Sequence, residues 1–228
     1  EVGNQILNVE KLSSSFDDRK LFTNVTFSVN KGDKIAFISR DPSAVTEFFN
    51  IVNDETKAES GSFEWGTTIT KAYLPVENSE YFQEDLNLMD WLRQYVPPHV
   101  PDVEQPFLRG FLGKMLFSGE DVMKKTTVLS GGEKVRCMLS KMMLQNPNCI
   151  VLDQPTNHLD LESIQSFNEQ CTVYSGVVLL TSHDHTFMQT VANRIIELTP
   201  KGIIDRLMTF DEYLADDRVK ALKEEMYA

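Results

Sequence analysis

A pair of glycines at the predicted start of a helix has the chemistry of an anion site. Gly131 and Gly132 follow Ser130 and precede Glu133. A serine with a glutamate three residues later forms a capping-box pattern, which satisfies free amides at a helix start. The glycines leave the backbone bare beside the positive end of the helix dipole, and phosphates bind in such places. Taken alone, the pattern is equally compatible with a flexible helix start.

An acid and an imidazole follow two other predicted elements. Asp153 ends the apolar run Cys149–Leu152, and His183 comes shortly after the apolar run Val177–Thr181. Short continuous apolar runs are typical of parallel strands buried on both faces. Ligands of open α/β sheets bind at the carboxyl ends of such strands, where a carboxylate can hold Mg²⁺ through water. We therefore expect these side chains at one ligand-binding edge.

The elements that position these residues indicate a mixed α/β core. Ile35–Ile38 is a third short apolar run and is expected as another buried strand. Ile6–Val9, Val25–Val29 and Gly61–Tyr73 instead mix β-branched and aromatic residues with turn signals, and we predict strands there too.

Two further segments are predicted to be helical. Leu86–Lys125 has a helical pattern that Val96–Pro101 interrupts, which indicates an inserted helical subdomain. Ala215–Ala228 is rich in charge and is predicted to form a helix that leads away from the body of the domain.

Composition limits the classes of function. The chain has 228 residues, 41% of them hydrophobic and 25% charged, which suffices for one large domain with a real core. No stretch approaches the roughly 20 uninterrupted apolar residues of a membrane helix, so no membrane partner is expected. A net charge of −12 argues against general nucleic-acid binding by this chain.

The chain ends and the cysteines indicate the compartment. Glu1–Glu10 lack the basic and apolar regions of a signal peptide, and a start at Glu rather than Met indicates a fragment of a longer protein. Cys137, Cys149 and Cys171 have no metal-binding spacing, and their odd number argues against a disulfide framework. We expect a cytoplasmic location.

Together these motifs resemble those of ATP-binding cassette (ABC) proteins. Leu129–Glu133 is similar to the signature motif of that family, and Val151–Pro155 to its Walker B motif. Leu159–Asp160 resembles the D-loop, and His183 corresponds to the switch histidine. The string Pro155–Asp160 is similar to the F-type subfamily, whose members are soluble, carry two cassettes in one chain and are associated with ribosomes and translation. The resemblance covers essentially the whole chain.

The resemblance implies a fold. We expect a P-loop NTPase-like ABC cassette, an α/β domain with a mixed central sheet, an antiparallel β-subdomain and an inserted α-helical subdomain. Residues 1–214 would form the cassette, with the insertion at about 86–125, and residues 215–228 a charged C-terminal helix. The similarity of Leu112–Glu133 and Ile195–Tyr213 to the F-type subfamily indicates its second cassette.

The resemblance also implies ligands and partners. In this family two cassettes pack head to tail, and each ATP with its Mg²⁺ lies between the P-loop of one cassette and the signature motif of the other. The partner cassette would lie in the same chain or in a homodimer, and the ribosome is a further expected partner. The residues assigned to the partner's ATP are Leu129, Ser130, Gly131, Gly132, Glu133 and Asp160.

The resemblance assigns the remaining site residues to the chain's own nucleotide. Thr46 and Asp153 would hold Mg²⁺, and Gln154 and His183 occupy catalytic positions. Phe16 stands where the family stacks an aromatic ring on adenine, although core packing is an equal alternative.

The expected P-loop is degenerate. Such a loop has the pattern Gly-x-x-x-x-Gly-Lys-Ser/Thr, in which amides cradle the phosphates and the lysine neutralises them. Aligned by position, Ser39 and Ala44 replace the glycines, and Val45 replaces the lysine. Thr46 keeps the metal-binding hydroxyl, while Asp41 adds a negative charge near the place of the phosphates. We expect the chain's own ATP site to be weak or empty.

Two further departures weaken the same site. Gln154 stands where the family has a glutamate, and an amide cannot accept the proton of the attacking water, a loss of about 10²–10⁴-fold in rate. The glutamine expected after Tyr73 is also absent, since the sequence there is Leu74–Glu77. Gln154 alone would be compatible with an engineered substitution, but three losses in separate segments favour a natural one. Hydrolysis is therefore expected of the full tandem protein and not of this half.

Three functions compete at this stage. The main hypothesis is an ATP-responsive half of an F-type translation factor, which supplies its signature motif to a competent partner site. The first alternative is a dimerisation scaffold that never binds nucleotide. The second is the cytosolic ATPase subunit of a membrane transporter, which the Asn157-His158 form of the motif disfavours.

Overall fold

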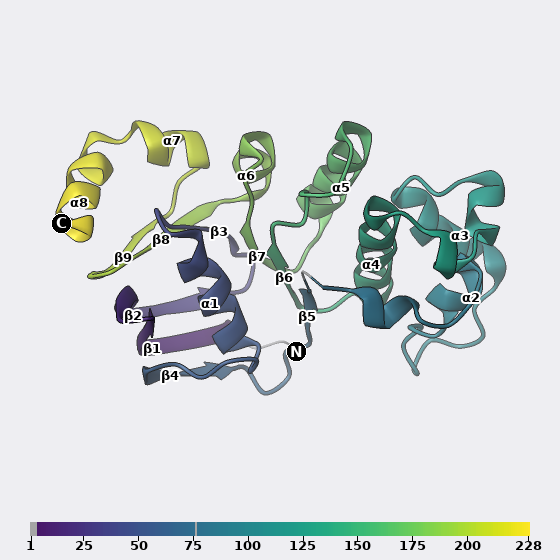
Figure 1. The fold of residues 1–228 in the computed structure, drawn as a ribbon, viewed down its shortest axis with the longest axis horizontal. Coiled ribbons are helices and arrows are strands. Elements are labelled where there is room, and N and C mark those ends of the chain that lie inside the picture. The colour runs from purple at the N-terminus through teal and green to yellow at the C-terminus, as the bar shows by residue number, and fades with distance from the viewer. Residues whose placement is uncertain (1–3, 76) are drawn as a thin grey trace. The chain divides into compact units, whose positions relative to one another are not determined.

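The computed structural model describes residues 4–75 and 77–228 (Figure 1). The chain forms two compact units, each with an interior of its own. The core unit contains the chain up to Tyr73 together with Asn148–Asp153 and Ser175–Ala228. The helical unit contains Leu74–Pro147 and Gln154–Tyr174.

The core unit begins with a three-stranded antiparallel sheet. Its strand order is β2-β1-β4, with β1 at Gln5–Phe16, β2 at Arg19–Asn30 and β4 at Ser60–Trp65. Asp17 and Asp18 join β1 to β2 with φ angles of 47° and 62°. A two-residue hairpin turn requires this left-handed conformation, which aspartate tolerates better than most residues. Two strands expected from the sequence therefore lie in one long hairpin.

The single strand expected at Gly61–Tyr73 is in fact two strands. β4 ends at Trp65, and β5 begins only at Lys71. Between them the amide of Ile69 donates to the carbonyl of Gly66 at 3.1 Å and closes a turn. The prediction of one strand was wrong because the β-forming residues on both sides of Gly66 concealed this turn.

The second sheet of the core unit is mixed and has the order β5-β6-β7-β3-β8-β9. Its strands are β5 (Lys71–Leu74), β6 (Cys149–Asp153), β7 (Val177–Thr181), β3 (Lys34–Ile38), β8 (Arg194–Thr199) and β9 (Gly202–Arg206). The four strands from β6 to β8 in this order are parallel, and β9 is antiparallel to β8. Every residue of β6 and β7 is buried, as their continuous apolar runs predict, and every residue of β8 is buried as well.

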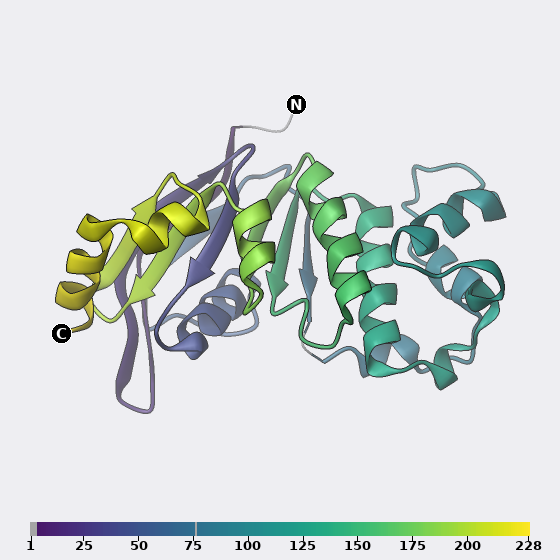
Figure 2. The ribbon, with the colours of Figure 1, turned by 90° about the horizontal axis from the view of Figure 1, so that it is seen from above.

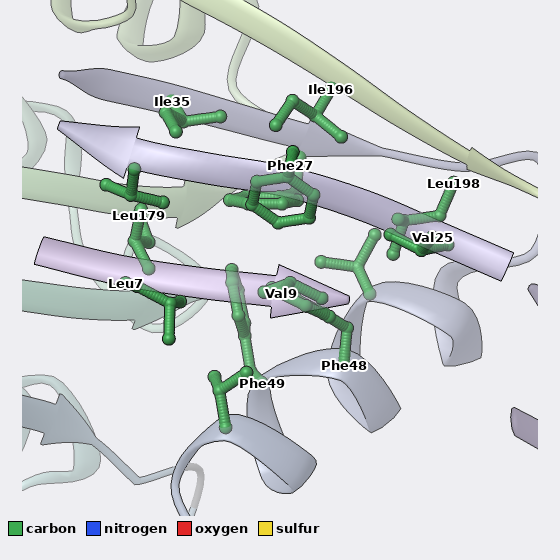
Figure 3. Close-up of a cluster of buried hydrophobic side chains, with 14 of the residues drawn as sticks. Leu7, Val9, Val25, Phe27, Ile35, Phe48, Phe49, Leu179, Ile196 and Leu198 are labelled. Atoms are coloured by element: carbon green, nitrogen blue, oxygen red, sulfur yellow. The ribbon is translucent and has the colours of Figure 1, made fainter. Parts of the chain in front are cut away.

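Helix α1 (Pro42–Val52) packs against strands of both sheets. Phe48 of α1 stacks on Phe37 of β3 with ring centroids 5.0 Å apart, and Phe49 meets the same ring edge-on at 5.4 Å. Aromatic pairs of this kind add about 0.5–1.5 kcal/mol beyond the area they bury. The labelled neighbours in Figure 3 are Leu7, Val9, Val25, Phe27, Ile35, Leu179, Ile196 and Leu198. This core fixes the first turns of α1 relative to the sheets.

Three further helices complete the core unit. They are α6 (His185–Val191), α7 (Phe210–Ala215) and α8 (Asp217–Tyr227), and they lie over the face of the six-stranded sheet opposite to α1 (Figure 2). The sequence predicts a C-terminal helix that leads away from the body, but α8 contacts α7 and β9. It packs back because the hydroxyl of Tyr227 reaches the buried Glu197 of β8 at 2.9 Å.

The helical unit has its own small core. Its α-helices are α2 (Leu88–Arg93), α3 (Gln105–Lys114), α4 (Gly131–Gln145) and α5 (Leu161–Val173), with short 3₁₀ turns at Ser79–Phe82, Gly119–Met123 and Thr126–Val128. Trp91 is buried, stacks on Phe82 with ring centroids 4.9 Å apart and donates its Nε1 to the carbonyl of Tyr81 at 2.7 Å. The limits of the expected insertion at about 86–125 stay a prediction.

None of the helices in residues 4–75 and 77–228 combines the length and the apolar character that a membrane crossing requires. Cys137, Cys149 and Cys171 are buried free thiols. Burial raises the pKa of the Cys137 and Cys149 thiols well above the usual range, so these two behave as small hydrophobic residues.

Candidate nucleotide site

Parallel strands bring the expected groups to one edge of the core unit. Asp153 at the end of β6 pairs in register with Thr181 at the end of β7, and the loop that follows Ile38 leaves β3 in the same direction. His183 is exposed in the turn between β7 and α6, where the carboxylate of Asp184 caps α6 by accepting from the Phe187 amide at 2.7 Å. Asp153, Thr181 and the loop after Ile38 therefore lie at one edge of the sheet, as expected, and ligand binding at that edge stays a prediction.

The two residues expected to bind a metal are hydrogen-bonded to each other. Thr46 donates its Oγ1 to Oδ2 of Asp153 at 2.8 Å. Burial raises the pKa of the Asp153 carboxyl, and the bond from Thr46 offsets part of that rise. Burial, and then the charges of Asp153 and Glu55, raise the pKa of nearby Tyr73 to about 12.

A hydroxyl and a carboxylate are ligands that suit Mg²⁺, but they do not make a complete site. In the described part of the chain no cluster of three or more His, Cys, Asp or Glu side chains could hold a metal ion. Mg²⁺ at Thr46 and Asp153 would need oxygen atoms from water and phosphate to complete its six ligands.

The loop before α1 does not have the form of a phosphate-binding loop. Helix α1 begins at Pro42, and Asp41 is its N-cap. Oδ1 of Asp41 accepts from the amide of Ser43 at 3.1 Å, and the Asp41 carbonyl accepts from the amide of Ala44 at 3.0 Å. Arg19 lies against the other carboxylate oxygen at 3.0 Å. A carboxylate of the chain itself therefore occupies the helix terminus where a phosphate would be stabilised.

The positions of the missing glycine and lysine face the core. Ala44 is fully buried, and Val45 is 2% exposed and belongs to the same hydrophobic cluster as Phe48. Val45 therefore contributes to the core and offers no polar group to a phosphate. Ser39 is half-buried at the start of the loop.

Phe16 ends β1 and is 60% exposed, so the alternative that it packs in the core is wrong. An exposed aromatic ring remains available to stack on a base. The residues on both sides of it line an open cavity of about 500 Å³. The cavity is lined by Ser14, Ser15, Asp17, Asp18, Lys20, Glu47, Lys57, Ala58 and Glu59. Four carboxylates against two lysines make this cavity unfavourable for a polyanion.

Gln154 has a left-handed backbone in the turn after β6. Its φ is 49°, and its carbonyl accepts from the amide of Asn157 at 3.4 Å. A residue with a Cβ pays about 1–2 kcal/mol for this conformation. The sequence lacks the expected glutamine in the segment Leu74–Glu77. One residue of that segment, Val76, lies outside the described residues.

The glycine pair lies at the start of α4 with the predicted cap. The amide of Glu133 donates to Oγ of Ser130, and the amide of Ser130 donates to Oε1 of Glu133, both at 3.2 Å. Lys124 holds the other carboxylate oxygen of Glu133 at 3.0 Å. Burial works to raise the pKa of Glu133, but the bonds from Lys124 and Ser130 outweigh it and leave this pKa below its usual value. The capping box predicted from the sequence is confirmed.

The two glycines serve different purposes. A Cβ added at Gly131 would meet no other atom within 4 Å in the described part of the chain, so this residue presents a bare, exposed backbone. A Cβ at Gly132 would lie 2.5 Å from the carbonyl oxygen of His158. Gly132 is therefore required for packing inside the helical unit, and Gly131 is not. Leu129, just before the cap, is buried at 9% exposure.

Asp160 begins the next helix of the same unit. Its Oδ1 accepts from the amide of Ser163 at 2.8 Å and caps α5. Bonds from Ser163 hold the pKa of Asp160 below its usual value. Leu161 beside it is 85% exposed, so the start of α5 presents both a charge and an apolar side chain.

Comparison with known sequences identifies the family. The family model described as ABC transporter matches residues 22–157, which is more than half of the chain. This chain belongs to the ABC transporter family. It is 56% identical over 229 residues to the uncharacterized ABC transporter ATP-binding protein YkpA of Bacillus subtilis (strain 168), a match that covers 100% of this chain and 42% of YkpA.

A more distant relative carries the F-family name. The cassette is 28% identical to ABC transporter F family member 5 of Arabidopsis thaliana over 98% of this chain and 32% of that protein. The chain therefore spans well under half the length of either relative.

A solved cassette has the same fold. A dimeric ATP-binding cassette in a post-hydrolysis state, bound to ADP and Pi, superimposes with a TM-score of 0.70 at 14% identity over 89% of this chain and 99% of that chain. At this identity the likeness shows the fold alone. The α/β cassette predicted from the sequence is confirmed.

Domains of the ABC family bind ATP with Mg²⁺, and the residues of this cassette fit those ligands unequally. Thr46 and Asp153 suit the metal ion. The loop before α1 does not fit a triphosphate, because Asp41 caps the helix and Val45 lies in the core. The capped start of α4, with Gly131 bare, suits a phosphate.

Three residues in the neighbourhood of the loop were not anticipated from the sequence. Arg19 neutralises Asp41, and Tyr227 and Glu224 of α8 contact Arg40. No local pattern links residues that are 184 positions apart, as Arg40 and Glu224 are.

Proposed function

We propose that this chain is one half of a two-cassette protein of the F type, and that it completes the partner's ATP site with the start of α4. Its own loop would leave the nucleotide weakly bound or absent, and ATP hydrolysis would occur at the partner's P-loop. The observation that supports this best is the contrast between two helix starts. α4 presents the bare backbone of Gly131, whereas α1 is capped by its own Asp41.

Electrostatics explain why the contrast supports the proposed function. A helix start stabilises an anion through its free amides and its dipole, and α4 offers this at an exposed position. At α1 an incoming phosphate would have to displace Asp41 and would be repelled by it at close range. A triphosphate is therefore stabilised at the start of α4 and destabilised at the start of α1.

The length of the relatives supports the two-cassette part of the proposal. The match covers 42% of YkpA and 32% of ABC transporter F family member 5, which leaves room for a second cassette in proteins of that length. The solved cassette with the same fold is dimeric and is bound to ADP and Pi. Head-to-tail pairing would bring Ser130, Gly131 and Asp160 of this chain to the partner's nucleotide.

Membership of the F type would make the protein a cytoplasmic, ribosome-associated factor. The net charge of −12 gives this chain no general attraction to RNA phosphates, so a ribosome contact would have to be local or made by another part of the protein. Copurification with membranes instead of ribosomes would contradict this part of the proposal and favour a transporter subunit.

Substitution of Gly131 by Ala in the two-cassette protein tests the central claim. A methyl group at this bare position would displace the partner's phosphate, and a displacement of about 1 Å costs on the order of 10²-fold in rate. We expect ATPase activity to fall by about that factor with normal folding, as checked by circular dichroism. Unchanged ATPase activity would contradict the proposal and favour the alternative function, a dimerisation scaffold.

A nucleotide titration tests the chain's own site. We expect the 228-residue chain to show no saturable binding of a fluorescent ATP analogue at micromolar concentration with physiological Mg²⁺. Binding in the micromolar range would show that the loop before α1 holds a triphosphate despite Asp41.

A further inference from the structure

Helix α8 contacts the degenerate loop at Ser39, whose side chain is hydrogen-bonded to Tyr227, and at three points on Arg40. The backbone amide of Arg40 donates to the hydroxyl of Tyr227 at 3.0 Å. The Arg40 guanidinium lies over the ring of Tyr227, 4.3 Å from its centroid. Its Nη2 is paired with Oε1 of Glu224 at 2.5 Å. One turn of α8 therefore holds the backbone and the side chain of Arg40 together with the side chain of Ser39.

The other side of Tyr227 is tied to the interior of the core unit. Its hydroxyl lies 2.9 Å from Oε1 of Glu197 and 3.1 Å from the carbonyl of Leu198, so its proton is donated to these β8 acceptors. Glu197 is 2% exposed and also accepts from Tyr213 of α7 at 2.6 Å. Lys223 of α8 lies 3.3 Å from the same carboxylate. The Tyr227 hydroxyl thus connects the loop to a buried network on β8.

We propose that α8 is an intramolecular strap that fixes the loop Ser39–Asp41 in one conformation without nucleotide. The inference rests on the proposed function, in which no triphosphate orders this loop. In a working P-loop the phosphates bind the loop amides and hold them in place. Here the Tyr227 hydroxyl holds the amide of Arg40, and the carboxylate of Asp41 holds the start of α1.

The strap has a consequence for the two-cassette protein. A loop that is fixed by the chain's own C-terminal helix keeps the same shape through every stage of the partner's ATP cycle. The degenerate half then presents a constant surface, and nucleotide-dependent change is confined to the site that the start of α4 completes.

Substitution of Tyr227 by Phe tests the strap, because it removes one hydroxyl and keeps the ring beneath Arg40. Hydrogen exchange of the Arg40 amide, measured by NMR in the 228-residue chain, is expected to become at least about 10-fold faster. Amides of the buried strands β3 and β7 are expected to keep their protection. Exchange at Arg40 that is unchanged in the variant would overturn the proposal.

Substitution of Tyr213 by Phe is the matched control. It removes a hydroxyl from the same Glu197 carboxylate, but Tyr213 lies on α7 and the bonds of its hydroxyl do not include the loop. We expect exchange at Arg40 within about twofold of the unsubstituted chain. If this variant accelerates exchange at Arg40 as much as the Tyr227 variant does, the effect is general loosening of the network, and the strap is refuted.

Two further arms keep the test decisive. If the Tyr227 variant does not fold, Glu224→Gln provides a second test, because it removes the ion pair to Arg40 by changing an exposed residue. Hydrogen exchange of the Arg40 amide that is no faster in this variant than in the unsubstituted chain would refute the strap. Addition of Mg-ATP to the unsubstituted chain is expected to leave exchange at Arg40 unchanged. Slower exchange of the Arg40 amide with Mg-ATP would contradict the proposal that the chain's own ATP site is weak or empty. The strap itself is tested only by the substituted chains.

Discussion

At the scale of single residues, two side chains that suit a metal ion lie beside a loop whose own contacts leave little for a phosphate to bind. Thr46 and Asp153 are hydrogen-bonded as a pair, while Val45 belongs to the core. The Asp153 carboxyl is buried, and a buried carboxylate that has no metal ion beside it favours its protonated form. Asp153 therefore lowers the free energy of unfolding of the metal-free chain, and the size of this effect depends on pH.

Substitution of Asp153 by Asn should stabilise the metal-free chain at neutral pH. Because the pKa of Asp153 is raised in the folded state, its ionised form destabilises the fold above the unfolded pKa, and this effect vanishes as pH falls and the carboxyl is protonated. We expect the free energy of unfolding to rise by about 1 kcal/mol at pH 7 and to be unchanged near pH 4.

Urea denaturation with EDTA at several pH values measures this, with Asp102→Asn as the control at an exposed loop residue. A gain that grows towards acid pH would contradict the assigned sign.

At the scale of elements, the starts of α1 and α4 differ in how their first amides are bonded. Both starts carry a carboxylate: that of Asp41 accepts from the first-turn amide of Ser43 at α1, whereas at α4 the Ser130 hydroxyl accepts from the first-turn amide and the Glu133 carboxylate accepts from the amide of the N-cap residue. The glycines after Ser130 also differ, since Gly132 lies against the His158 carbonyl and Gly131 faces open space. The packing role of Gly132 is therefore separable from the proposed ligand-binding role of Gly131.

Alanine substitutions at the two glycines should separate folding from function. Gly131→Ala is expected to leave the 228-residue chain as stable as before or up to about 1 kcal/mol more stable, because alanine is the better helix former. Gly132→Ala is expected to cost about 1–3 kcal/mol, because its Cβ would lie 2.5 Å from the oxygen of His158 and the turn would have to move.

Thermal or urea denaturation of the two variants measures the difference. Equal stabilities of the two variants would mean that the turn at His158 moves without a cost in stability. Gly131 and Gly132 would then not differ in their structural role, and a loss of ATPase activity in the two-cassette protein could not be assigned to Gly131 alone.

At the scale of the whole molecule, local chemistry was predictable and long-range chemistry was not. The apolar runs identified β3, β6 and β7, and the Ser130–Glu133 pattern identified the start of α4, because each depends on neighbours in sequence. The placement of α8 was missed because it depends on Tyr227 meeting Glu197 and Arg40. Charge patterns in a helix do not reveal a distant partner.

The sequence differences in the loop could be read directly, but the contacts that the loop makes could not. Position by position, the sequence shows that the glycines and the lysine are absent from residues 39–46. It does not show that Asp41 would turn inwards and cap α1, or that Arg19 would neutralise it. Because these contacts involve several residues, we expect that no single substitution makes the loop bind a triphosphate.

Restoring the general base should therefore not restore hydrolysis. In the 228-residue chain with Gln154→Glu, we expect phosphate release from Mg-ATP to stay within about twofold of the unsubstituted chain. A base contributes about 10²–10⁴-fold only where ATP is bound in position, and the Asp41 cap and the buried Val45 are unchanged by this substitution.

The two-cassette protein, assayed in parallel, is the positive control for phosphate release. A rise of 10-fold or more in the variant would mean that the loop binds ATP productively. In that case Gln154 alone would silence this half, and the asymmetry between the starts of α1 and α4 would not determine where the nucleotide is hydrolysed.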